Sequence, residues 1–173
     1  MMRRIGASED KMFDALGNIA IAYQMVGRHE ESLNIRWDLY AGSLKFYGEE
    51  HGDTVHAANN YAASLLELER YAEVKALLRK TMPVARRVLG DSSDITLRIR
   101  WNYGKALYMD DGATLDDVRE AVTTLEETTR ISKRVLGGAH PLTARIESHL
   151  KCSRTMLQLM LRAVGECVND TSK

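Results

Sequence analysis

KRVLGGAHPLT (133–143) is similar in sequence to a stretch that begins 47 residues earlier, RRVLGDSSDIT (86–96). Taken alone, the first stretch is typical of an active-site loop, because a histidine stands beside a proline in a glycine-rich segment. The second copy favours another interpretation, in which the stretch joins two units of an internal repeat. When the copies are aligned on their glycine, the position of His140 is occupied by His51 and Ser93 in the other copies. We call such a set of equivalent positions a column. A residue that begins a helix fits that variation, whereas a catalytic base does not need that register.

The glycine that follows the leucine in these stretches recurs along the chain. It follows an apolar or aromatic residue at Gly6, Gly48, Gly90 and Gly137, so the intervals are 42, 42 and 47 residues. We assign the extra residues of the last interval to an inserted loop within MDDGATLDD (109–117). Two further columns keep the register: a base lies three residues before each glycine, and an asparagine lies twelve residues after the first three. Several agreeing columns indicate a true repeat.

Each column has a physical explanation. Glycine after an apolar residue is a common helix stop, because it reaches the left-handed conformation at little cost. A base in the last helical turn is favoured by the helix dipole, and Pro141 suits a first turn. Apolar residues recur at spacings of three and four, as in Leu16, Ile19, Ala20 and Tyr23. Each unit is therefore predicted to be a helix, a tight turn, a second helix and a glycine stop.

These units predict an all-α chain with a single domain over residues 1–173. We place the repeats at about 6–47, 48–89 and 90–136, followed by a C-terminal capping helix at 141–168. With Gly6 as the first stop, Met1–Ile5 would be the last turn of a preceding helix, so the chain could be a segment of a longer array.

Composition excludes several classes of protein. Lys plus Arg is 24 and Asp plus Glu is 24, so the formal charge is zero, which argues against broad capture of nucleic acid or of an anionic membrane. No long apolar run predicts a membrane span. The two cysteines, Cys152 and Cys167, form neither a disulfide framework nor a zinc ligand set. We expect free thiols and, by elimination, a cytoplasmic location.

The repeat resembles a known family. NIAIAYQMVGRHEESL (18–33) and NYAASLLELERYAEVKALL (60–78) resemble the tetratricopeptide repeat motif. The 42-residue spacing and the linkers between units resemble the longer variety found in kinesin light chains; the linkers are YGEEHGDT (47–54), LGDSSDIT (89–96) and LGGAHPLT (136–143). The resemblance covers about residues 5 to 150. It implies a right-handed superhelical solenoid of antiparallel helix pairs, about three and a half repeats long, whose first helices line a concave face that binds peptides.

If peptides bind there, the asparagine column supplies the contacts. An amide offers two donors and an acceptor, so a row of amides can clamp an extended backbone of any sequence. Neighbours on the same face would add specificity: Trp101 with Tyr108 as an apolar pocket, and Arg98 with Lys105 as partners for an acidic group. The predicted peptide-binding residues are Asn18, Asn59, Asn60, Asn102, Arg98, Trp101, Lys105 and Tyr108.

Three functional hypotheses follow. The first is a scaffold or adaptor that binds a segment of a partner protein in the groove. The second is a purely structural array segment that positions neighbouring domains, in which the asparagine column only joins helices. The third is a thiol enzyme that uses Cys152 with His149, one helical turn apart. No orienting carboxylate, third metal ligand or phosphate-binding motif accompanies that pair, so we expect no enzymatic activity, no cofactor and no metal.

Overall fold

The computed structural model describes residues 2–170, with side chains described for residues 12–164. Within this part of the chain the only regular elements are helices, and none of them is long and apolar enough to cross a membrane. The helices are α1 (Met2–Met25), α2 (His29–Tyr47), α3 (Gly52–Glu67), α4 (Tyr71–Leu89), α5 (Asp94–Met109), α6 (Leu115–Leu136) and α7 (Pro141–Asp170).

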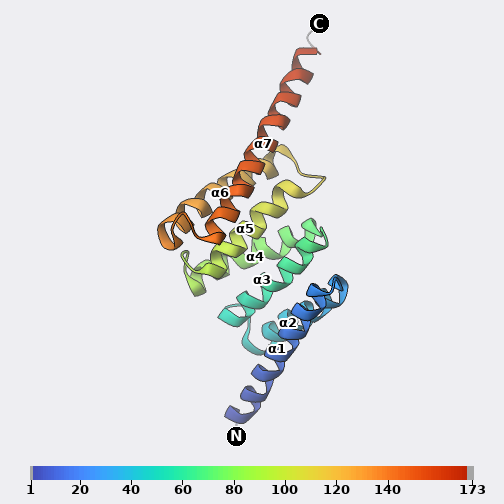
Figure 1. Ribbon diagram of the computed structural model, residues 1–173, viewed down its shortest axis with the longest axis vertical. Coiled ribbons are helices and arrows are strands. Elements are labelled where there is room, and N and C mark those ends of the chain that lie inside the picture. The colour runs from blue at the N-terminus through green and yellow to red at the C-terminus, as the bar shows by residue number, and fades with distance from the viewer. Residues whose placement is uncertain (1, 171–173) are drawn as a thin grey trace.

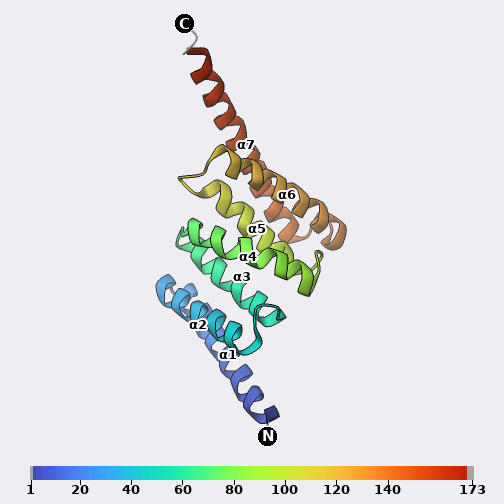
Figure 2. The ribbon, with the colours of Figure 1, turned by 180° about the vertical axis from the view of Figure 1, so that it is seen from behind.

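The helices form an elongated solenoid of antiparallel pairs (Figure 1). Each helix packs on the next one in the chain, and the first helices of successive pairs also pack, α3 on α5 and α5 on α7. The exception is at the N-terminal end, where the backbones of the described parts of α1 and α3 lie too far apart for such packing. The termini lie at opposite ends of the array, and α7 projects beyond it (Figures 1 and 2).

Glycine ends α2, α4 and α6, as the repeat predicted. Gly48, Gly90 and Gly137 have φ angles of 82°, 85° and 88°. The N–H of each donates to the carbonyl four residues earlier, which satisfies an otherwise free acceptor of the last turn. The stop expected at Gly6 is wrong, because α1 runs without a break from Met2 to Met25. A glycine inside a helix costs only about 1 kcal/mol relative to alanine, so it does not by itself end one.

The histidines of the linkers begin helices. The Nδ1 of His140 accepts a hydrogen bond from the N–H of Leu142 at 3.2 Å, at the start of α7. The Nδ1 of His51 accepts from the N–H of Asp53 at 3.2 Å, at the start of α3. The interpretation of His140 as a helix-start residue is thus confirmed. Capping of this kind satisfies one of the free donors of a first turn.

The hydrophobic core is concentrated in the later pairs. Its large, fully buried members come from α3 to α7: Leu65, Leu78, Leu97, Tyr103, Leu107, Leu125 and Ile146. Of the described side chains, α2 gives this cluster only Leu33, and α1 gives it none. The first pair is therefore held to the array by less buried apolar surface than the other pairs.

Candidate functional site

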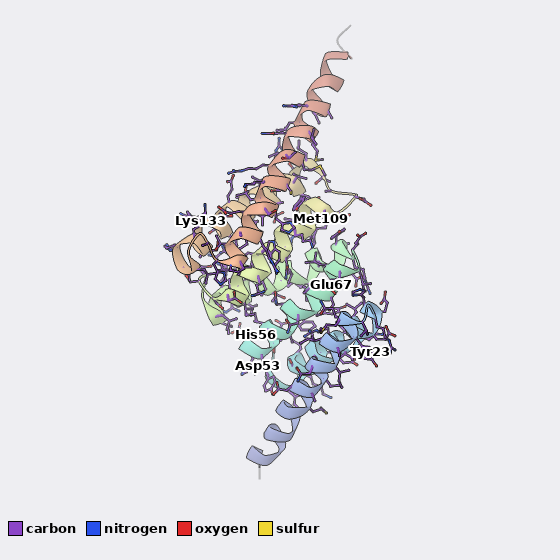
Figure 3. The ribbon with its side chains drawn as sticks, in the orientation of Figure 1. Tyr23, Asp53, His56, Glu67, Met109 and Lys133 are labelled. Atoms are coloured by element: carbon purple, nitrogen blue, oxygen red, sulfur yellow. The ribbon has the colours of Figure 1, made fainter. Side chains whose placement is uncertain are left out.

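A cleft of about 440 Å³ lies between α1 and α3, with α2 as its floor. Figure 3 labels Asp53 and His56 on the first turns of α3, near α1. The lining residues are Phe13, Asp14, Gly17, Asn18 and Ile21 from α1, Arg36, Leu39, Ser43 and Tyr47 from α2, and Asp53, His56, Ala57 and Asn60 from α3. The cleft is therefore on the face formed by the first helices, where the sequence predicted a groove.

The repeat register explains why this cleft is open. Where α3 meets α5, Asn59 contacts Asn102, and its Oδ1 accepts from the Asn102 Nδ2 at 3.2 Å. Where α5 meets α7, the corresponding residues are Trp101 and His149, whose ring centroids are 5.5 Å apart.

Where α1 meets α3, the same register sets Gly17 opposite Asn60. Glycine has no side chain to reach across, and a Cβ added at Gly17 would meet nothing within 4 Å. The absence of this bridging side chain leaves the space between α1 and α3 unfilled.

Beyond the cleft, polar side chains join the end of α1 and the start of α2 to the end of α3. Gln24 of α1 donates a hydrogen bond to the carboxylate of Glu67 at the end of α3. The Nδ1 of His29 lies 3.4 Å from the other oxygen of Glu67, at ion-pair distance but without hydrogen-bond alignment. Figure 3 shows Glu67 near the end of α1 that carries Tyr23. Glu67 therefore ties α3 to the first pair, whereas the cleft itself lies nearer the start of α3, beside Asp53 and His56.

The predicted asparagine row divides into two kinds of residue. Asn18 and Asn60 are exposed, line the cleft and bond to no other described side chain. Asn102 and Asn59 are 6% and 5% exposed and bond to each other. Asn18 and Asn60, toward the N-terminal end of the array, thus have free amides, whereas Asn59 and Asn102 hold α3 against α5.

The remaining predicted residues lie where α5 approaches α7. Tyr108 is buried, and its hydroxyl is 2.6 Å from the Nδ1 of His149. His149 also packs on Trp101, so the apolar pocket expected between Trp101 and Tyr108 is filled by the imidazole of α7. Arg98 and Lys105 are half-exposed, and the Nε of Arg98 donates to Asp94 at 2.6 Å.

The thiol and the imidazole of the enzyme hypothesis differ in exposure. Cys152 is exposed and unpaired, and the side chain of Cys167 lies outside the described residues. The Nδ1 of His149 is taken by Tyr108, and burial, assisted by the charge of Lys105, lowers the pKa of His149. Within the described side chains no three His, Cys, Asp or Glu residues are arranged to hold a metal ion.

Sequence reasoning missed Gly17 and Arg36, although both carry a signal. Counting back from the glycine stops, Arg36 occupies the column of Leu78 and Leu125, which are core residues with no exposed surface. Gly17 occupies the column of Asn59 and Trp101. Both residues depart from the chemistry of their column, and both departures line the same cleft.

Comparisons with known proteins agree with this architecture. Residues 11–86 match the family model of the tetratricopeptide repeat. Among solved structures, the nearly identical TPR-like repeats of a candidate kinesin light chain from Podosopora anserina share 20% identity with this chain, at a TM-score of 0.74. That match covers 89% of this chain and 71% of the other. A variant of the same protein gives 21% identity and a TM-score of 0.75, over 89% and 70%. No curated protein matches the sequence.

Proposed function

We propose that this chain, an array of tetratricopeptide repeats of the kinesin light chain-like kind, binds an extended segment of a partner protein in the cleft between α1 and α3. Arrays with this fold generally serve as protein-interaction or scaffold modules. The observation that carries the proposal is the cleft itself, which is lined by two exposed amides, Asn18 and Asn60, that have no described side-chain partner.

The cleft offers both backbone recognition and apolar contact. The amides of Asn18 and Asn60 can each donate to a peptide carbonyl and accept from a peptide N–H. Each such bond is worth about 0.5–1.5 kcal/mol net. Phe13 and the 45% exposed Ile21 provide apolar surface between them. An extended chain segment uses this combination, because its backbone bonds supply affinity and its side chains supply specificity.

The proposal separates the predicted binding residues into two groups. Asn59, Asn102, Trp101 and Tyr108 act in holding the first helices together, as their contacts with one another and with His149 indicate. Asn18 and Asn60 contact the partner. Arg98 and Lys105 would extend the contact surface along α5, since both remain half-exposed. The proposal includes a cytoplasmic location, which the exposed, unpaired thiol of Cys152 supports.

A peptide selection tests this function. Random peptides of about ten residues would be displayed and selected against the immobilised chain, and the affinities of the selected peptides measured by fluorescence anisotropy. Asn18→Ala with Asn60→Ala should weaken binding about tenfold, the loss expected for two hydrogen bonds. Asn34→Ala is the matched control, because Asn34 is an exposed asparagine of α2 outside the cleft.

The same experiment decides between the interaction module and the purely structural segment. Selected peptides whose affinity depends on Asn18 and Asn60 support the module. Failure to select any peptide, or equal affinity of the double variant and the parent chain, would contradict it and favour the structural segment. Circular dichroism of the double variant should show an unchanged helix content, because both side chains are exposed and bond to no other described side chain.

A further inference from the structure

Arg36 is a charged residue in a column of buried leucines. The equivalent positions of the next two pairs, Leu78 and Leu125, have no exposed surface and belong to the main core. Arg36 points instead into the cleft between α1 and α3, where it lines the floor beside Leu39 and Ser43. A leucine here would make the floor apolar, so the arginine brings a positive charge to the base of the proposed binding cleft.

The guanidinium of Arg36 lacks a partner within the described part of the chain. Its Nε is inaccessible to solvent and makes no hydrogen bond. Burial lowers the pKa of Arg36, an effect that the distant charge of Glu67 opposes only in part. A buried donor without an acceptor is unfavourable, and natural structures rarely keep one without a reason. The two Nη atoms are not enclosed in this way and have no hydrogen bond or ion pair with a described residue, so they are the donors that an acceptor in the cleft would reach.

A second inward-facing arginine, Arg100, allows a comparison. Its Nε, like that of Arg36, is buried without a hydrogen bond, so the two residues differ in whether their charge is paired. Arg100 is 2% exposed, in a column that holds Leu16 and Ala58 in the earlier pairs. Its Nη2 lies 2.9 Å from Asp91, and its Nη1 lies 3.4 Å from Glu127. Arg100 thus has two carboxylates of its own chain, whereas Arg36 has no ion pair with any described residue.

The rims of the cleft carry the opposite charge. Asp14 on α1 and Asp53 on α3 are exposed and line the two sides, and His56 lies one turn beyond Asp53. Asp53 is within 3.5 Å of the Nδ1 of His51, and Asp14 has no ion pair among the described residues. A segment bound here would meet a cation below it and carboxylates on either side.

Building on the proposed function, we infer that the partner segment carries an acidic side chain that accepts a hydrogen bond from Arg36, flanked by basic side chains that face Asp14 and Asp53. The planar guanidinium matches a carboxylate and can bind it through two parallel N–H donors. The acidic rims disfavour a more highly charged acid, such as a phosphorylated serine, in the same position.

The peptides selected above provide the test. They should be enriched in one Asp or Glu with Lys or Arg on both sides. Replacing that Glu by Gln in a selected peptide should weaken binding to the parent chain about tenfold, since the amide keeps one acceptor oxygen but loses the negative charge and the second acceptor. The same replacement should change binding to Arg36→Met by less than about twofold. Arg130→Met is the matched control, because Arg130 is an exposed arginine of α6 outside the cleft.

A second measurement excludes a merely structural role. Arg36→Met should melt at the same temperature as the parent chain or higher, because a half-buried charge without an ion pair is removed. A lower melting temperature would mean that Arg36 supports the fold, and would overturn the inference. Replacement of the Glu by phosphoserine should weaken binding; tighter binding would contradict the carboxylate.

The outcomes separate this inference from the function on which it rests. Peptides that depend on Asn18 and Asn60 but show no acidic preference, or that bind Arg36→Met as tightly as the parent, would overturn the acidic partner alone. Peptides that ignore Asn18 and Asn60 would overturn the cleft as the binding site.

Discussion

The joint between α1 and α3 and the joint between α3 and α5 are built from the same columns of the repeat, yet one is open and the other closed. In the closed joint Asn59 bonds Asn102 across the gap, and both amides are buried. In the open joint the residue that faces Asn60 is Gly17, which has no side chain to reach across the gap. A column therefore does not fix the role of its residue, because the role also depends on what the neighbouring repeat places opposite.

The largest expected difference between the two joints is in stability. Leu107 of α5 is fully buried, so Leu107→Ala should lower the free energy of unfolding by about 2–5 kcal/mol. Ile21 lines the open cleft at 45% exposure, and Ile21→Ala should change it by no more than about 0.5 kcal/mol. Urea denaturation followed by circular dichroism would measure both. Comparable losses would show that the first joint is as tightly packed as the second.

The two asparagines of one column should differ next. Asn102→Ala leaves the buried amide of Asn59 without its partner, so it should destabilise the chain by about 1–3 kcal/mol. Asn60→Ala should have little effect on stability, since Asn60 is exposed and bonds to no described side chain. Thermal melts of the two single variants make the comparison directly. A larger loss for Asn60→Ala would reverse the assignment of structural and binding roles.

Gly17 offers a way to turn the open joint into a closed one. Gly17→Trp introduces the residue that fills the same column in α5, and there is space for its Cβ. The ring should occupy the cleft and weaken peptide binding about tenfold or more while the fold persists. Gly17→Ala is the control: it should bind peptide normally and raise stability by up to about 1 kcal/mol, because alanine favours the helix. Undiminished binding by Gly17→Trp would place the peptide elsewhere.

The smallest expected effect concerns the closed joint between α5 and α7. Burial, with the charge of Lys105, lowers the folded-state pKa of His149 below its ordinary value of about 6.5. The unfolded chain then binds the proton more readily, so the stability from this group is complete above that value and is lost as the pH falls through it. The melting temperature should therefore drop between about pH 7.5 and about pH 5.5. His149→Gln should show a smaller drop; an equal drop would assign the effect to other groups.

Much of the fold follows from the columns alone. The glycine stops and the helix-start histidines were predictable because backbone conformation and capping act within a few residues of each position. The stop at Gly6 was not, since a glycine also fits inside a helix at modest cost and the sequence alone does not show that α1 continues.

The site was predictable only in part. The face and the amides of Asn18 and Asn60 follow from the register, whereas the burial of Asn102 depends on Asn59 in the preceding repeat. The imidazole that fills the space beside Trp101 depends likewise on the following repeat. The sequence prediction relied on residues that are alike in successive repeats. Arg36 and Gly17 were overlooked because each differs from the residues at the equivalent positions of the later repeats.

The central claim is that the partner's main binding site is the open joint between α1 and α3 and not one of the closed joints. The most direct test is to titrate the isotope-labelled chain with the tightest selected peptide and to follow backbone amide chemical shifts. The shifts should concentrate at residues 13–21 of α1 and 53–60 of α3, and at Arg36 on the floor of the cleft. Shifts that concentrate over α5 and α7, or in the second hollow of about 370 Å³ between α2 and α4, would contradict it.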